Sequence, residues 1–577
     1  MPKKMPTRSG LLNTAAIAAA SGLFLYLGWL VLYRLALMPG LHADEARFGL
    51  ASLDVLQRGI QTIHGVNHRT GAAYPWLVSV AFRLGGTSVW TLRSVGAIAN
   101  LLAVALLTWS LHRYRSKRAV AFLLLIVVCS PFIVVNARVA WEVTALQFLL
   151  VSIQISILLG AIHQGRMNNG AGLAFAITSS LGVFNHFIFL SNLFAFFLSS
   201  ACLYVLSASD SHQKTFASRL LHLSILTVAF AAILIVLKPI IGDAQRQWLV
   251  AVIFMVAFVL CFSSFVSRSS ADFCEQMIAR LCQRLAEAGK AILPLARHVQ
   301  ARQFGLATVI TAAVIIGLMA DFGGRSPWVL YTKHTWGLLG SLTSVLPLQR
   351  IMMHPLQDDY LIISHGFWIV LLGIYAWLTS RVILAAIKTK GATCDIDLIF
   401  YLYPIFAFVV LPIFVQLSSE RYYLITCYLM VSCVPILLAS PPSKEVFAYP
   451  FFQPKRPLAF VATGMLLLLI LSDAISAQRT ILASIGRDNS QTEGFTITYP
   501  GYSDTSLHFA DTAKLYNDLK DQQVCRNIKA NFFILEPLRF YRAIDGDRCS
   551  GNRYAQITYC ESCSQPGDHF EVLVKNR

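Results

Sequence analysis

The sequence predicts a mostly α-helical, polytopic membrane protein with about 13 transmembrane helices, followed by a small α/β domain outside the membrane. Three observations support this fold class. Of the 577 residues, 56% are hydrophobic and only 13% are charged, whereas a soluble chain carries about 25% charged residues. The apolar residues form runs long enough to span a bilayer. The basic residues cluster between those runs, as expected of cytoplasmic loops.

Runs of spanning length recur along residues 1–474, which we assign to a transmembrane domain. The basic opening MPKKMPTRSG precedes a long apolar run without a clear cleavage site, so we expect a retained first helix and a cytoplasmic N-terminus. The apolar block 171–206 is long enough for two helices, and we divide it at FNHF, Phe184 to Phe187. The predicted spans are 13–38, 92–111, 119–136, 143–162, 171–186, 187–206, 220–240, 248–266, 304–320, 361–380, 398–417, 423–440 and 458–474.

Charges between the spans predict which loops face the cytoplasm. The loop HRYRSKR at 112–118 holds four basic residues, and the loops assigned to its side hold most other Lys and Arg outside the C-terminal tail. The formal net charge of +18 would also suit nucleic-acid binding, but basic residues confined to short loops argue against that partner. Segment 267–303 has the apolar spacing of a membrane-surface helix, and a solvated linker helix fits it equally well.

An odd number of spans places the C-terminal segment, 475–577, outside the cytoplasm, where its polar sequence predicts a soluble domain of about 100 residues. Within it, FADTAKLYNDLKDQQ predicts a helix, and NFFIL and FEVLVK predict strands. Its cysteines favour disulfides because that compartment is oxidising, although CESC would also suit half of a zinc site. The pairing is open among the three connectivities of Cys525, Cys549, Cys560 and Cys563.

The first loop on the outer side, 39–91, begins with the adjacent acids Asp44 and Glu45. From Glu45 to Leu56 the apolar residues recur at helical spacing, which predicts an amphipathic helix along the membrane surface. Asp44 suits the N-cap of that helix, and Glu45 suits its positive dipole end. These roles explain the pair without any chemistry, so a functional reading depends on the surrounding motifs.

Those motifs read DEARFGLASLDVLQRG, HRTGAAYPWLVSVAFRLGG and WTLRSVGAIANLLAVALL. Over about residues 40–110 they resemble the first external loop and second span of polyprenyl-phosphate-sugar-dependent membrane glycosyltransferases of the GT-C fold. The group includes protein O-mannosyltransferases and the aminoarabinose transferase that modifies lipid A, and the predicted architecture is similar to that of the latter. The matching residues are Asp44, Glu45, Arg47, Phe48, Ser52, Gly59, Trp76, Gly85 and Gly86.

The chain departs from the family pattern in the middle of the same loop. Family members often carry a Lys-Pro pair there, with the Lys facing the donor phosphate, whereas the matching position here is Thr70-Gly71. Arg69 or His68 would have to supply the cationic group. The departure favours a more distant family member with its own acceptor.

Other external segments supply further candidates. Arg138 and Glu142 share a helical face in the second external loop, where related enzymes carry an Arg and an acid; an interfacial Arg paired with Glu142 explains them equally well. Arg421 and Tyr422 open a late span, as in the family. The resemblance implies that loop 321–360 closes over substrates. This loop also offers metal ligands that match no standard motif, namely His354, Asp358 and Asp359.

The resemblance implies sugar transfer from a polyprenyl phosphate to an acceptor hydroxyl, a poor nucleophile that needs a base. Asp44 is the first candidate for the base and Glu45 the second. No glycine-rich phosphate loop is present, which argues against a nucleotide-sugar donor. Cations should stabilise the departing phosphate, and the candidates are Arg58, Arg69, Arg138, Lys333, Arg350 and Arg421. Candidates for other substrate contacts are Arg47, His68, Glu142 and Tyr422.

We therefore expect a hexosyl- or pentosyltransferase of a bacterial inner membrane, with the C-terminal domain in the periplasm. Its partners are membrane lipids, a polyprenyl-linked donor and a lipid, glycan or protein acceptor. The sequence assigns no cofactor, and a divalent metal stays open. A lipid-linked polysaccharide ligase or polymerase is one alternative, since loop 321–360 could hold its Arg and His. A flippase or transporter is another, and predicts internal repeats and charges at mid-span. A purely structural subunit is a third alternative, and the acidic pair counts against it.

Overall fold

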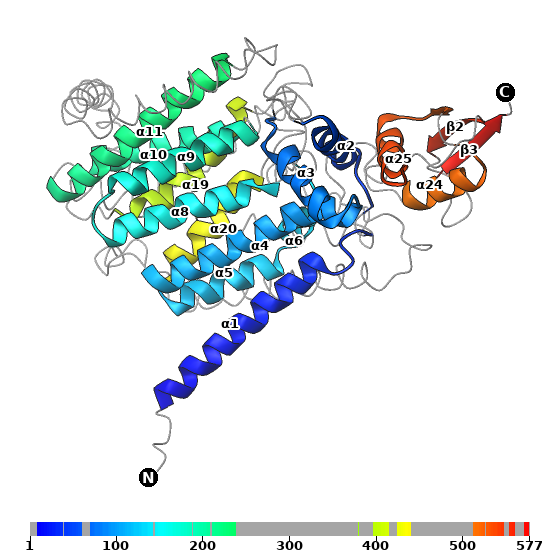
Figure 1. The fold of residues 1–577 in the computed structure, drawn as a ribbon. Coiled ribbons are helices and arrows are strands. Elements are labelled where there is room, and N and C mark those ends of the chain that lie inside the picture. Colours follow the sequence, from blue (N-terminus) through cyan, green and yellow to red (C-terminus); the bar gives the residue numbers. More distant parts are fainter. Residues whose placement is uncertain are drawn as a thin grey trace, which may run out of the picture.

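The chain forms a helical bundle with a small sheet near its C-terminus (Figure 1), so the mostly α class with a minor β component is confirmed. The predicted spans 248–266, 304–320 and 458–474, and most of 361–380, lie outside the described residues. The computed structural model describes residues 8–37, 40–59, 70–141, 145–186, 188–207, 211–237, 375, 379, 396–414, 424–439, 512–524, 527–546, 553–559 and 570–575.

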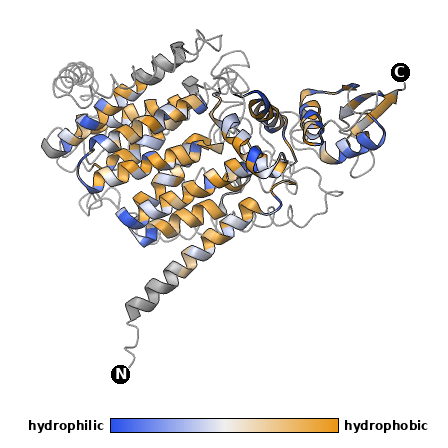
Figure 2. Cartoon of the chain, in the orientation of Figure 1, coloured by the Kyte–Doolittle hydropathy of each residue, from blue (hydrophilic) through white to orange (hydrophobic). Residues whose placement is uncertain are grey.

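Apolar residues dominate the helices of the bundle (Figure 2). Two of the described helices, α4 and α10, are long and apolar enough to cross a bilayer, and several others are apolar but shorter, so the number of about 13 spans stays a prediction. The bundle helices are α1 (Arg8–Leu32), α4 (Val89–Tyr114), α5 (Lys117–Cys129), α6 (Pro131–Ala137), α8 (Gln147–His163), α9 (Asn169–Asn185), α10 (Phe189–Leu206), α11 (Ser211–Leu237), α19 (Leu398–Phe414) and α20 (Leu424–Ala439).

Breaks between helices follow local chemistry. The division of the block 171–206 at FNHF is confirmed, since α9 ends at Asn185 and α10 begins at Phe189. The predicted span 119–136 is two helices in the structure, α5 and α6. Pro131 has no backbone N–H to continue α5 and suits the first position of α6. Ser130 caps α6, because its hydroxyl accepts a hydrogen bond from the Ile133 amide at 3.4 Å.

Aromatic contacts and one polar network join the bundle helices. Phe148 of α8 stacks on Tyr428 of α20, with ring centroids 4.5 Å apart. Gln154 of α8 donates to the hydroxyl of Ser179 on α9 at 2.8 Å, and its carbonyl accepts from the amide of Asn192 on α10 at 2.7 Å. These buried groups fix α8, α9 and α10 relative to one another, because a buried polar group is costly unless it is paired.

Loops that the sequence assigns to the cytoplasm meet at one end of the bundle. Arg115, after α4, forms a two-pronged ion pair with Asp397, before α19, and its Nη1 lies 2.6 Å from Asp397 Oδ2. The Tyr114 ring lies 5.4 Å from that of His163 at the end of α8. The loop after α8 also contacts α11 (Ser211–Leu237), since Arg219 of that helix donates to the Met167 carbonyl at 3.2 Å. We call this the Arg115 end.

Two further helices lie at the opposite end, which we call the α2 end. Helix α2 (Ala43–Arg58) covers the predicted amphipathic helix, and α3 (Ala73–Gly85) follows it. Helix α3 is two-faced: Tyr74, Val78 and Phe82 are buried, while the exposed large residues on its other face are Trp76, Val80 and Leu84. Both helices therefore pack one face against the end of the bundle or against each other.

The C-terminal elements form a three-stranded sheet with two helices. They are α24 (Thr512–Asp521), β1 (Asn527–Lys529), α25 (Phe532–Ile544), β2 (Tyr554–Tyr559) and β3 (Phe570–Lys575). The sheet order is β1-β2-β3, with β1 parallel and β3 antiparallel to the central β2. Its small core includes Leu515, Leu519, Ile534, Leu538 and Ile557.

Two of the three elements predicted in this segment are confirmed, the helix at FADTAKLYNDLKDQQ and the strand at FEVLVK. The strand predicted at NFFIL is wrong, because these residues begin α25. Asn531 caps that helix by accepting a hydrogen bond from the Ile534 amide at 3.1 Å. Ile534 and Leu538, one turn apart, both face the core. A short apolar run does not distinguish a strand from a buried helical turn.

Candidate active site

Helix α2 begins with a reciprocal cap made by His42 and Glu45. The Asp44 amide donates to His42 Nδ1 at 3.0 Å, and the His42 amide donates to Glu45 Oε2 at 3.0 Å. The prediction that Asp44 is the N-cap is therefore wrong, since His42 holds that position. The helix begins two residues earlier than the amphipathic pattern indicates, because the imidazole supplies an acceptor that the pattern does not reveal.

Glu45 forms a buried salt bridge with Arg93 of α4. Arg93 Nε lies 2.8 Å from Glu45 Oε1, and Arg93 Nη2 lies 2.7 Å from Glu45 Oε2. Neither side chain is exposed. Two parallel N–H···O bonds of this kind are the strongest ion-pair geometry available to a carboxylate.

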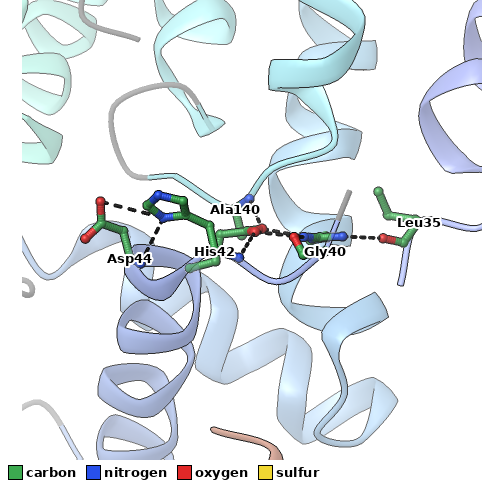
Figure 3. Close-up of polar contacts among 7 residues, drawn as sticks. Leu35, Gly40, His42, Asp44 and Ala140 are labelled. Atoms are coloured by element: carbon green, nitrogen blue, oxygen red, sulfur yellow. Dashed lines mark hydrogen bonds and ion pairs between the residues drawn. The ribbon is translucent and has the colours of Figure 1, made fainter. Parts of the chain in front are cut away.

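The same pair ties several segments of the α2 end together (Figure 3). Arg93 also donates to the carbonyls of Leu35 at 3.0 Å and Gly40 at 2.9 Å. Glu45 Oε1 accepts a further bond from the Ala140 amide at 2.7 Å. Each Glu45 oxygen thus accepts two hydrogen bonds, which matches the roughly four acceptor positions of a carboxylate. This geometry assigns Glu45 to holding α2 on the bundle.

Asp44 lies next to Glu45 but in different surroundings. Its side chain is 26% exposed, and its Oδ2 lies 3.8 Å from His42 Nδ1. Figure 3 shows the Asp44 carboxylate at the opposite end of the row of drawn side chains from Leu35. The first turn of a helix also stabilises negative charge. Asp44 therefore presents a partly exposed carboxylate at the start of a helix whose first turn is fixed by Glu45.

The imidazole of His42 is itself fixed. It is 5% exposed, and its edge meets the indole of Trp141, with centroids 5.2 Å apart and planes at 80°. Trp141 follows Ala140 in the segment that bonds to Glu45. The segment after α6 therefore contacts both capping residues, His42 and Glu45, which restricts the first turn of α2 and the Asp44 carboxylate within it.

The cationic candidates on α2 lie at different distances from Asp44. Arg47 is exposed and lies one turn along the helix, so it is on the Asp44 side of α2. Arg58 pairs with Asp54 at 3.2 Å and lies at the other end of α2, about 21 Å further along the axis. The structure brings Arg47 close to Asp44 and does not bring Arg58 there.

Arg138 contacts the end of α1 in the structure. Its Nη1 donates to the carbonyls of Leu30 and Val31, and its Nη2 donates to the Tyr33 carbonyl at 2.8 Å. Burial, with a smaller contribution from the positive charge of Arg93, lowers the pKa of Arg138 to about 9, so it stays cationic at pH 7. Carbonyls at the end of a helix have no hydrogen-bond donor within the helix, and the Arg138 guanidinium donates to these.

The departure from the family pattern at Thr70-Gly71 has a structural explanation. Thr70 forms a β-bridge with His186, and the Gly71 amide donates to the Asn185 carbonyl at 3.2 Å. A Cβ on Gly71 would lie 3.0 Å from the carbonyl carbon of Phe184 and closer still to its oxygen. No larger residue fits at this position, and the pair fastens the start of the segment before α3 to the turn between α9 and α10.

The remaining candidates lie outside the described residues. Among the residues that the structure describes, no group of three or more His, Cys, Asp or Glu could hold a metal ion. The candidates outside are His68, Arg69, Glu142, Lys333, Arg350, His354, Asp358, Asp359, Arg421, Tyr422, Cys525, Cys549, Cys560 and Cys563.

Two residues of the site were missed by sequence reasoning, Arg93 and His42. Arg93 stands at the start of the predicted span 92–111, and an ionisable residue in a span is itself a signal of a functional or structural partner. His42 gives no comparable signal, because a histidine before an acidic pair suits many loop conformations.

Comparisons with known proteins give matches by structure and none by sequence. No family model and no curated protein matches the chain. ArnT from Cupriavidus metallidurans is similar in its apo state, with 13% identity, coverage of 95% of this chain and 93% of ArnT, and a TM-score of 0.43. Its structure bound to undecaprenyl phosphate gives 13% identity, 94% and 93% coverage, and a TM-score of 0.41.

The archaeal oligosaccharyltransferase AglB from Archaeoglobus fulgidus, in complex with an inhibitory peptide and a dolichol-phosphate, is also similar. It is 13% identical, the match covers 88% of this chain and 59% of AglB, and the TM-score is 0.41. Similarity at this level does not assign an activity, so the function is argued from the residues of the chain itself.

Proposed function

We propose that the chain is an integral-membrane glycosyltransferase that moves a sugar from a polyprenyl-phosphate donor to an acceptor hydroxyl on the extracytoplasmic face. The observation that carries the proposal is the contrast between Asp44 and Glu45. Glu45 is buried and has its oxygens bonded to Arg93, His42 and Ala140, whereas the Asp44 carboxylate reaches solvent. Glu45 supports the helix, whereas Asp44 keeps a partly exposed carboxylate beside His42.

In the proposed reaction Asp44 acts as the general base. An Asp44 oxygen accepts the proton of the acceptor hydroxyl while the acceptor oxygen bonds to the anomeric carbon of the sugar. The bond from that carbon to the phosphate oxygen breaks, and polyprenyl phosphate leaves with the bonding electrons. Protonated Asp44 then loses its proton to water, which completes the cycle without a redox partner.

The departing phosphate gains negative charge as the bond breaks, so cations should stabilise it. Arg47 is the described cation that lies nearest Asp44 along α2, and its exposed guanidinium suits a phosphate. We propose that further cations come from Arg69, Lys333, Arg350 and Arg421. Arg138 is engaged by carbonyls of α1, and we propose for it a supporting role instead.

Donor consumption tests the proposed function. Purified protein in detergent is given labelled polyprenyl-phosphate sugar and a pool of lipid, glycan and protein acceptors. We expect the wild-type protein to release polyprenyl phosphate and D44N to do so about 10²- to 10⁴-fold more slowly, the usual effect of losing a general base. If the wild-type protein consumes no polyprenyl sugar with any acceptor, the proposal is wrong.

The matched control is D54N. Asp54 is an exposed carboxylate on the same helix, paired with Arg58, and it lies ten positions from Asp44. D54N removes the same charge from α2 and is expected to turn over donor at the wild-type rate. An equal loss in D44N and D54N would show that the net charge of α2, and not a base at Asp44, supports the reaction.

A further inference from the structure

One aromatic residue of the C-terminal segment packs outside the core of that segment, against the helix that carries Asp44. Phe540 of α25 is fully buried. Its neighbours Ile534 and Leu538 belong to the core under the C-terminal sheet, whereas Phe540 belongs to the cluster formed by α2, α3 and α4. Phe540 is thus the anchor of the C-terminal elements on the α2 end.

The contact between Phe540 and α2 requires a glycine. A Cβ on Gly49 would lie 2.7 Å from Phe540 Cζ and closer still to Cε2, inside the closest approach of two carbon atoms. Phe82 of α3 also stacks on the Phe540 ring, with centroids 6.4 Å apart and planes at 29°. The Phe540 ring therefore sits directly on the backbone of α2, beside α3.

Gly49 lies one turn after Glu45, so both residues are on the same face of α2. Glu45 fixes the first turn through Arg93 and Ala140, and Phe540 meets the second turn at Gly49. A single point of contact leaves a short helix free to rotate and tilt, whereas two points one turn apart restrict both motions. Asp44 lies at the start of the helix that they fix.

We propose that Phe540 is a positioning residue for Asp44: the C-terminal elements hold α2 through Phe540 and Gly49, and thereby set the orientation of the Asp44 carboxylate. This inference rests on the proposed function as far as Asp44 is a base, but its geometric half, the hold on α2, is independent of any reaction. It gives the C-terminal segment a role in the chemistry without placing it in contact with substrate.

The test uses the full-length protein and two opposite ways of disturbing the contact. F540A removes the ring, and G49A adds a methyl group that collides with it. F540L is the conservative variant, and R539Q is the matched control, since Arg539 is exposed on the same helix. The double variant G49A/F540A gives the added methyl group the space left by the ring.

Hydrogen exchange of the α2 amides is the readout that does not depend on activity. We expect faster exchange across α2 in F540A and G49A, with exchange in β2 and β3 unchanged as evidence that the C-terminal sheet is still folded. F540L and R539Q are expected to lie closer to wild type than the two disruptive variants, and G49A/F540A is expected to exchange like F540A because it also lacks the ring. Exchange in α2 equal to wild type in both F540A and G49A overturns the proposal.

Turnover of polyprenyl-phosphate sugar is the second readout. Misplacing a catalytic group by about 1 Å costs about 10²-fold, so we expect F540A and G49A to lower kcat by about 10- to 100-fold with little change in the donor KM. A kcat that falls only with the folded fraction overturns the link to Asp44. If the wild-type protein turns over no donor but α2 exchange rises in F540A and G49A, the proposed function fails and the hold on α2 stands.

Discussion

At the scale of single residues, the adjacent acids Asp44 and Glu45 have different environments because neighbouring positions on a helix do not share a face. Glu45 faces the bundle and meets Arg93, and Asp44 faces outward beside His42. A buried carboxylate without a partner would be very costly. Arg93 is therefore what allows α2 to begin with two acids in succession and still lie on the bundle.

The salt bridge predicts a specific pattern of stability changes. E45Q and R93M each leave one buried charge without its partner, so each should lower the free energy of unfolding by about 3–5 kcal/mol. The double variant E45Q/R93M removes both charges and should lose less than the sum of the two. Denaturant unfolding in detergent micelles measures all three.

D54N is again the matched control, because the exposed pair of Asp54 and Arg58 should contribute about 0–1 kcal/mol. Losses that are additive in the double variant would mean that Glu45 and Arg93 do not interact. Losses no larger than that of D54N would contradict a buried pair altogether.

At the scale of helices, Arg138 serves as a partner for the last carbonyls of α1. Because its guanidinium donates to Leu30, Val31 and Tyr33, it joins the segment after α6 to the end of the first helix. This segment also supplies the Ala140 amide to Glu45 and the Trp141 ring to His42. The end of α1 and the start of α2 are thus held by the same short segment.

Substitution of Arg138 distinguishes this role from donor binding. R138Q leaves buried carbonyls without donors and should lower the free energy of unfolding by about 1–3 kcal/mol, while the KM for polyprenyl-phosphate sugar stays near that of wild type. Unfolding and steady-state kinetics on the same preparations give both values. A raised donor KM with unchanged stability would instead indicate that Arg138 binds the donor phosphate.

Elements with a strong local pattern were predictable from the sequence, and partners far apart in the chain were not. The periodicity of α2, the break at FNHF and the strand FEVLVK all depend on neighbouring residues. Glu45 and Arg93 are 48 positions apart, and Arg115 and Asp397 are 282 apart, so no local pattern reveals them. NFFIL was assigned wrongly because its capping residue, Asn531, lies at the edge of an ambiguous apolar run.

At the scale of the whole molecule, contacts between loops follow the alternation that the charges predict. The loops around Arg115, His163 and Asp397 meet at one end, and the loops around Glu45, Ala140 and Asn185 meet at the other. Phe540 joins the C-terminal elements to this second end. Among the described residues, α2 and α25 therefore lie at one end of the bundle and Arg115 lies at the other.

Cysteine labelling tests this arrangement in membranes. In a background without reactive native cysteines, R58C and R539C should react with a membrane-impermeant maleimide from the same side. R118C, at the Arg115 end, should react only from the other side. Arg118 and Arg58 are both exposed, so a difference in labelling reports sidedness and not burial. Labelling of R118C together with R58C in sealed vesicles would contradict the arrangement.

The division of roles between Asp44 and Glu45 is the central claim, and the single-turnover rate of donor cleavage tests it most directly. Wild type, D44N and E45Q are each mixed with excess acceptor and with labelled donor at a concentration below that of the enzyme. Each rate is then divided by the folded fraction of its sample. We predict that D44N remains about 10²- to 10⁴-fold slower, whereas E45Q, which loosens the first turn of α2 but keeps the Asp44 carboxylate, is slowed by no more than about 10- to 100-fold. A corrected rate for D44N equal to wild type, or a loss confined to E45Q, would contradict the account.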